Sequence, residues 1–170
     1  DPDEGMHSLC AGSLPHQIIA DLPVDAGSRA RFEALLDAQA GEIAGVMTEP
    51  LVQGAGGMKF HSPETLQAMR EACDARGLPL IFDEIMTGFG RLGTLFAAGK
   101  AGVTPDIMTV SKALTGGTLP LAAAIASKQI FNAFWSDQAS AALMHGPTYM
   151  GNPAACAAAN ASLDLFEREP

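Results

Sequence analysis

The sequence predicts an α/β fold in which a mostly parallel sheet is flanked by helices. Two apolar runs, Leu80–Glu84 and Asp106–Lys112, have the length and β-branched content of buried parallel strands. Helical stretches separate three of the four such runs in the chain, which is the pattern of βαβ units. Asp83 and Lys112 stand near the ends of the two runs, and the carboxyl ends of parallel strands border the crevice in which open α/β sheets bind ligands. We therefore expect the functional site at that edge.

The first half of the chain predicts a loop, a helix, a strand and a second helix. Residues 1–25 contain three prolines and no sustained periodicity, which indicates a loop. Apolar residues follow a helical stripe over residues 28–43, with Ser28 as the N-cap. Gly45–Pro50 predicts a short buried strand. The second helix begins at Ser62 and Pro63, a capping hydroxyl and a proline at the first helical position, and ends at Gly77.

The second half continues the alternation. Thr94–Gly102 predicts a short helix between the two central strands, and Leu119–Ser127 is a further apolar run with the composition of a strand. Lys128–Trp135 predicts another helix. Asn152 and the following proline predict the start of a last helix that ends around residue 167.

Composition excludes several function classes. The formal net charge is −9, from 19 acidic and 10 basic residues without a Lys/Arg cluster, so no nucleic-acid partner is expected. No apolar run approaches the roughly 20 residues that span a bilayer, so no membrane association is expected. The cysteines are odd in number and too scattered for a metal site, which favours a reducing, cytoplasmic location: Cys10, Cys73 and Cys156.

The residues alone leave three interpretations of Asp83 and Lys112 open. The two could form a salt bridge, a substrate clamp, or the two anchor points of pyridoxal phosphate (PLP). In the last case Lys112 binds the cofactor aldehyde, and Asp83 keeps the pyridine nitrogen protonated so that the ring withdraws electrons. Structural Asp/Lys pairs are the commoner case. The loop at Gln53–Gly57, with three glycines, is either an ordinary connection or a close approach of backbone to a ligand.

Two motifs resemble a known family. Phe82–Arg91, which reads FDEIMTGFGR, resembles the cofactor-strand motif of the class III PLP-dependent aminotransferases, and Ser111–Gly117, which reads SKALTGG, resembles their lysine motif. Asp83 and Lys112 are 29 residues apart, a separation typical of that family. The resemblance implies a fold-type I large domain, of which residues 1–170 would be the central part. The family's phosphate loop would precede this part and its small domain would follow, so this part alone is expected to be inactive.

The resemblance also implies roles for individual residues. Lys112 would carry the cofactor and move the proton, Asp83 would contact the pyridine nitrogen, and Ile85 would pack on one face of the ring. Pro147 and Thr148 would reach the cofactor phosphate of the neighbouring subunit, with Thr148 as a donor to the anion. A homodimer with a shared active site follows from that placement.

Other positions carry weaker implications. Gly146 would line the substrate cleft, and Arg91 would either place a substrate carboxylate or brace its own turn through hydrogen bonds. Gln53 would contact the phenolic oxygen of the cofactor, and Leu92 replaces an expected threonine. His145 is left out of the catalytic set because with Lys112 available no second proton carrier is needed. Glu49 is left out because a carboxylate at a strand end can orient neighbouring backbone amides, and no metal is expected.

Three stretches resemble one branch of the family, which belongs to biotin biosynthesis: residues 49–58, 114–118 and 144–153. Branches that act on ornithine or 4-aminobutyrate carry Ser-Thr where this chain has Pro147 and Thr148. This branch implies S-adenosylmethionine as amino donor and 8-amino-7-oxononanoate as acceptor. Two alternatives stay open: a class III enzyme for ω-amino acids or diamines, and a non-catalytic α/β module that kept the motifs.

Overall fold

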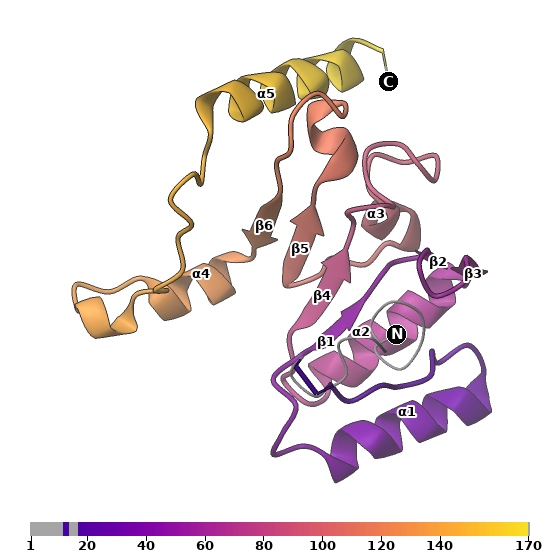
Figure 1. Cartoon of the computed structure of the whole chain (residues 1–170). Helices are drawn as coiled ribbons and strands as arrows, with labels where there is room; N and C mark the ends of the chain where they lie inside the picture. The colour runs from indigo at the N-terminus through magenta and orange to yellow at the C-terminus, as the bar shows by residue number, and fades with distance from the viewer. Residues whose placement is uncertain (1–11, 14–16, 170) are drawn as a thin grey trace.

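The computed structural model describes residues 12–13 and 17–169 and has a four-stranded, mixed sheet as its centre (Figure 1). The strand order is β1 (Val46–Thr48), β4 (Leu80–Asp83), β5 (Ile107–Val110) and β6 (Ala123–Ala126). The first three strands are parallel, and β6 pairs with β5 in the antiparallel direction. The predicted α/β fold with a mostly parallel sheet is therefore confirmed, and β6 is its antiparallel edge.

The core lies on one face of the sheet, under α2 (Pro63–Asp74). Strand alternation points Leu80 and Phe82 to this face, and neither side chain has any exposed surface. Leu66 and Cys73 of α2 are equally buried against them. This face therefore holds the packing that stabilises the sheet.

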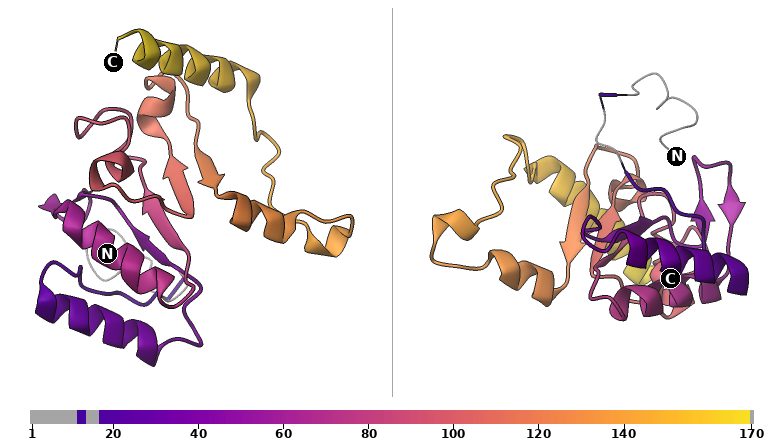
Figure 2. Two further views of the ribbon diagram at one scale, coloured as in Figure 1. Left: turned by 180° about the vertical axis from the view of Figure 1, so that it is seen from behind. Right: turned by 90° about the horizontal axis from the view of Figure 1, so that it is seen from below.

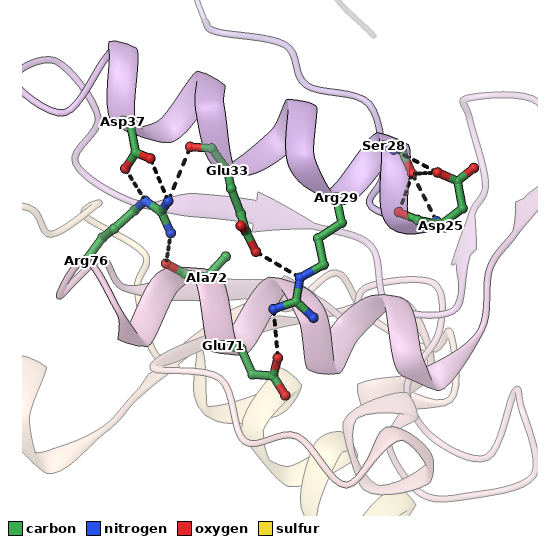
Figure 3. Close-up of polar contacts among 8 residues, drawn as sticks. All are labelled: Asp25, Ser28, Arg29, Glu33, Asp37, Glu71, Ala72 and Arg76. Carbon is green, nitrogen blue, oxygen red and sulfur yellow. Dashed lines mark hydrogen bonds and ion pairs between the residues drawn. The ribbon is translucent and has the colours of Figure 1, made fainter.

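Helix α1 (Ala26–Ala38) lies alongside α2, as Figures 1 and 2 show from several sides. Arg76 of the turn after α2 donates to both carboxylate oxygens of Asp37 on α1, at 2.7 and 2.9 Å (Figure 3). Arg29 of α1 likewise reaches Glu71 of α2 at 2.9 Å. The two helices are thus joined by ion pairs at the surface and by apolar contacts beneath.

The start of α1 corrects one prediction. The helix begins at Ala26 with Asp25 as its N-cap, so the assignment of Ser28 to that position is wrong. The Asp25 carboxylate accepts from the Ser28 N–H at 2.7 Å, and the Ser28 hydroxyl accepts from the Asp25 N–H at 2.9 Å (Figure 3). This reciprocal capping box satisfies two N–H groups at once, whereas a cap at Ser28 alone would satisfy fewer.

The remaining elements lie close to their predicted positions. Helix α2 begins at Pro63 as predicted but ends at Asp74, three residues before Gly77, which adopts a positive φ of 64° in the following turn. Helices α3 (Ala97–Ala101), α4 (Lys128–Phe134) and α5 (Pro153–Arg168) confirm three predicted helices. The Asn152 side chain caps α5 by accepting from two backbone N–H groups.

Four short elements were not expected from the sequence. Strands β2 (Val52–Gln53) and β3 (Lys59–Phe60) form an antiparallel hairpin around the glycine-rich loop. The 3₁₀ helix η2 (Lys112–Thr115) follows β5 directly, and η3 (Ala139–Ala141) follows α4. Over the described residues, no helix combines the length and apolar character needed to cross a bilayer.

Asp106 fastens the amino ends of β4 and β5 to α2. Its carboxylate accepts from the Leu80 N–H at 2.8 Å and from Arg70 of α2 at 2.7 Å. Burial alone would raise the pKa of Asp106, but the hydrogen bonds from Arg70 and from the Leu80 amide outweigh burial and hold the pKa below its ordinary value. The ionised carboxylate is therefore part of the folded structure.

Glu84 fastens the opposite, carboxyl end of β4. Its side chain is fully buried, and its carboxylate accepts from the Thr87 hydroxyl at 2.6 Å and from the N–H groups of Ala97 and Ala98 at 3.1 and 2.8 Å. Its own N–H donates to the Thr109 carbonyl of β5 at 2.9 Å. One buried carboxylate therefore links β4, the turn that follows it and the start of α3.

We expect Asp106 to make the stability of the complete protein depend on acid pH. Because its folded-state pKa is depressed, its contribution is present above the unfolded-state pKa of about 3.9 and is lost as the pH falls through the folded-state value. Asp106→Asn should lower the free energy of unfolding at pH 7 by about 2 kcal/mol, since Arg70 would keep only the exposed carboxylate of Asp74 as an ion-pair partner, and should flatten the acid dependence. Urea unfolding from pH 3 to pH 7 measures both effects. Asp164→Asn, at an exposed ion pair, is the control, and identical pH profiles for the two variants would contradict the assignment.

Glu84→Ala should destabilise the complete protein by roughly 3 kcal/mol or more, because two N–H groups and a hydroxyl would be left buried without an acceptor. Glu84→Gln keeps part of the acceptor set and should lose less. Chemical denaturation provides the measurement. Glu71→Ala, the control, removes an exposed carboxylate and should lower the free energy of unfolding by less than about 1 kcal/mol. A decrease for Glu84→Ala no larger than that of the control would show that the buried hydrogen bonds are dispensable.

Candidate active site

The site begins with two charged side chains at the carboxyl ends of neighbouring parallel strands. Asp83 is the last residue of β4 and pairs in register with Thr109 of β5. Lys112 follows Thr109 by three residues and opens η2. The structure therefore brings Asp83 and Lys112 to one edge of the sheet, as expected from the two apolar runs, while their chemical roles stay predictions.

Asp83 is half-buried and points to the face of the sheet opposite Phe82 and the core, because successive strand residues alternate. One carboxylate oxygen accepts from the Ile85 N–H at 3.0 Å, which holds the carboxylate at the strand end. None of the ion pairs among the described residues joins Lys112 to Asp83. The salt-bridge interpretation of the pair is therefore not supported.

Lys112 is exposed and has a φ of +48°, in the left-handed region that L residues rarely adopt. Side chains on either side hold its turn against the returning chain. The Ser111 hydroxyl donates to the Leu121 carbonyl at 2.7 Å, and the Thr115 hydroxyl donates to the Leu119 carbonyl at 2.6 Å. Strained backbone fixed by its surroundings is typical of functional sites, and here it presents an amine at the strand edge.

The glycine-rich hairpin packs beside the turn that follows β4. A Cβ on Gly54 would come within 2.5 Å of the Met86 sulfur, so a larger residue there would have to displace the flexible end of the Met86 side chain. The Glu49 carboxylate accepts from the Gly54 N–H at 3.0 Å, and Nε2 of His61 lies 3.1 Å from the Glu49 carbonyl oxygen. Glu49 thus orients backbone in this hairpin, while Gln53 lies half-buried in β2.

Arg91 and Leu92 lie in the loop between β4 and α3. Arg91 is exposed and makes neither a hydrogen bond nor an ion pair within the part of the chain that the structure describes, so bracing of the turn by its guanidinium is not observed. Leu92 packs against the apolar core, which accounts for an aliphatic residue at this position.

The third group of predicted site residues lies elsewhere. Gly146, Pro147 and Thr148, together with His145, belong to the exposed connector between α4 and α5. Figures 1 and 2 show this connector outside the β6 edge of the sheet, with β5 and β6 between it and β4. A single chain therefore does not bring these residues together with Asp83 and Lys112.

Sequence reasoning missed one residue of this edge. Thr109 faces the same side of the sheet as Asp83, and its hydroxyl oxygen is buried without a hydrogen-bond partner. In the sequence it is one more β-branched residue of an apolar run, and only the strand register reveals its neighbour. A buried hydroxyl without a partner is rare in native structures.

The donor set of this edge fits PLP better than a metal ion. An amine and a carboxylate emerge from neighbouring strands, Ile85 offers an apolar side chain beside them, and Thr109 offers an unused donor. Among the residues described, no three His, Cys, Asp or Glu side chains gather closely enough to hold a metal. The arrangement can hold a pyridine ring by its nitrogen and by a covalent bond to lysine.

Comparison with known proteins gives the same picture over the whole chain. The sequence profile of the family "Aminotransferase class-III" matches residues 1–170. The adenosylmethionine-8-amino-7-oxononanoate aminotransferase of Mycobacterium leprae is 53% identical, over 98% of this chain and 38% of its own length. The chain therefore spans well under half of this curated relative.

Solved structures agree with the fold. The crystal structure of adenosylmethionine-8-amino-7-oxononanoate aminotransferase from Methanocaldococcus jannaschii matches 96% of this chain and 38% of its own, with 34% identity and a TM-score of 0.87. An amine transaminase from an uncultivated Pseudomonas species, solved in its PLP-bound form, matches 84% of this chain and 33% of its own, with 40% identity and a TM-score of 0.75. On the match of the family profile to every residue, and on these structures, this chain belongs to the class III aminotransferases.

Proposed function

We propose that the complete protein is a PLP-dependent aminotransferase that transfers an amino group from S-adenosylmethionine to 8-amino-7-oxononanoate and thereby makes 7,8-diaminononanoate for biotin. The observation that carries this proposal is the pair Asp83 and Lys112 at neighbouring strand ends, in a chain 53% identical to a relative named for that reaction. Residues 1–170 would be the central part of its large domain. The phosphate loop and the small domain would be contributed by other parts of the protein.

Bound PLP supplies an electron sink that stabilises negative charge on the substrate carbon. The Nζ of Lys112 would hold the cofactor and, when free, would move a proton at the substrate carbon. The Asp83 carboxylate would keep a proton on the pyridine nitrogen. Ile85 would pack on the ring and exclude water from one face. Gly146 leaves room for a long substrate, and Arg91, exposed at the same end of the sheet, is available for a substrate carboxylate.

A homodimer completes the proposed site. The segment from α4 to the start of α5 is exposed and carries large apolar side chains, among them Trp135 at 75%, Met144 at 82% and Tyr149 at 87% relative exposure. Exposed apolar surface of this kind marks an interaction site. In a dimer the partner would cover this segment, and Pro147 and Thr148 would reach the phosphate of the neighbouring cofactor. The partners are otherwise small-molecule substrates.

A cytoplasmic location is consistent with the thiols. Both described cysteines, Cys73 and Cys156, are free. Burial raises the pKa of the Cys73 thiol to about 11, so this thiol stays protonated at neutral pH. Unpaired cysteines are the usual state in a reducing compartment.

The absorption spectrum of the complete protein tests the function. With PLP it should show a visible band that is absent in Lys112→Ala and retained in Lys100→Ala, a matched exposed lysine of α3. S-adenosylmethionine should bleach this band. Bleaching by an ω-amino acid or a diamine instead would assign the other substrate class of the family. A wild-type protein without any band would favour a non-catalytic module.

The dimer has its own test. Trp135→Glu should shift the complete protein from the mass of two chains toward the mass of one in sedimentation analysis and should weaken PLP retention, because Trp135 lies in the exposed segment beside the Phe131 ring. Val24→Glu replaces another exposed apolar residue, ahead of α1, and should leave the mass unchanged. An unchanged mass for Trp135→Glu would place the interface elsewhere.

A further inference from the structure

The face of the sheet that carries Asp83 holds one further polar side chain, Thr109. The strand registers define this face, since paired residues of neighbouring strands point to the same side. Apart from Asp83 and Thr109 its sheet residues are apolar: Met47, Ile81, Ile107, Ala124 and Ala126. Asp83 and Thr109 are direct neighbours on it, one on β4 and one on β5.

The Thr109 hydroxyl is buried and has no hydrogen-bond partner, while its backbone carbonyl accepts from the Glu84 N–H. A buried hydroxyl without a partner is unfavourable, and valine would fill the same space without that penalty. Only two other buried side-chain atoms of the described residues share this condition, Nδ1 of His61 and Nε of Arg70, and both lie outside this face. The missing partner of Thr109 therefore calls for an explanation.

The neighbouring carboxylate is the acceptor that this face offers. One oxygen of Asp83 accepts from the Ile85 N–H at 3.0 Å, and a carboxylate has room for several further donors. Directly paired strand residues place their Cβ atoms roughly 5 Å apart, so a change of side-chain rotamer in Asp83 or Thr109 can bring the hydroxyl to the carboxylate.

We propose that Thr109 is a positioning residue that donates its O–H to the Asp83 carboxylate when PLP is bound, an inference that rests on the proposed function. The carboxylate is then held by donors from two directions, the N–H of Ile85, two residues later in the chain, and the Thr109 hydroxyl on the next strand. Hydrogen bonds to an ionised carboxylate are among the stronger ones, and two of them fix its orientation toward the pyridine nitrogen.

The test is PLP affinity measured against the stability of the cofactor-free protein. Titration of the cofactor-free complete protein with PLP should show affinity that is about tenfold to hundredfold weaker for Thr109→Val than for wild type, and nearly restored in Thr109→Ser. The melting temperature of cofactor-free Thr109→Val should equal or exceed that of wild type, because the lost hydroxyl has no partner there. Thr48→Val is the matched control: its hydroxyl contacts the Glu49 carbonyl on the core face, so this change should lower the melting temperature and spare PLP affinity.

A double-mutant cycle shows whether Thr109 acts through Asp83. In an Asp83→Ala background, Thr109→Val should cause no further loss of PLP affinity. Any one of four results would overturn the proposal. Two concern PLP affinity: Thr109→Val binds PLP as tightly as wild type, or Thr109→Ser fails to restore the affinity. The others are a fall in the melting temperature of cofactor-free Thr109→Val as large as that of Thr48→Val, and full additivity of Thr109→Val with Asp83→Ala. In each of these cases the wild-type protein still binds PLP, so the proposed function would stand. If the wild-type protein does not bind PLP, the proposed function is overturned as well.

Discussion

The parallel pairing of β4 with β5 is the constraint on which this structure depends. Its register sets Asp83 beside Thr109 and thereby brings Lys112 to the same edge. A slip of one residue would turn Thr109 to the core face. The pairing is held at both ends: at the amino end the Asp106 carboxylate accepts from the Leu80 N–H, and at the carboxyl end the Glu84 N–H donates to Thr109. The fixed register therefore brings two distant sequence motifs to one edge of the sheet.

The carboxylates of Asp83 and Glu84, consecutive residues at the end of β4, lie in different surroundings. Glu84 is fully buried, and its carboxylate accepts hydrogen bonds from three protein donors. These bonds join the strand to its turn and to α3. Asp83 faces the other side of the sheet, is half-buried, and is committed to one backbone donor at Ile85. Alternation of side chains along the strand separates the structural carboxylate from the one that we propose for the cofactor. The stability of the turn is thus supplied by a residue that leaves Asp83 free for a ligand.

Most of the fold could be predicted from the sequence because apolar runs and helix caps are local signals. The antiparallel direction of β6 could not, since it depends on pairing with β5. The β2–β3 hairpin could not either, because its strands have only two residues each and are too short to leave a periodic pattern. Ser28 was misassigned because two good caps three residues apart compete, and the capping box favours Asp25. Within the site, Asp83 and Lys112 follow from the motifs, whereas Thr109 is recognised only from its strand register and its unpartnered hydroxyl.

The connector between α4 and α5 explains why one chain holds only part of the proposed site. Its backbone runs outside the β6 edge, and its large side chains find no cover among the described residues, with Tyr149 and Met144 more than four-fifths exposed. Ordering such a segment costs conformational entropy that its own few contacts do not offset. Burial against a second copy would supply the missing apolar contact and in the same event carry Thr148 to a neighbouring cofactor. In the proposed dimer, assembly and completion of the site are therefore one process, and cofactor binding and subunit association should stabilise each other.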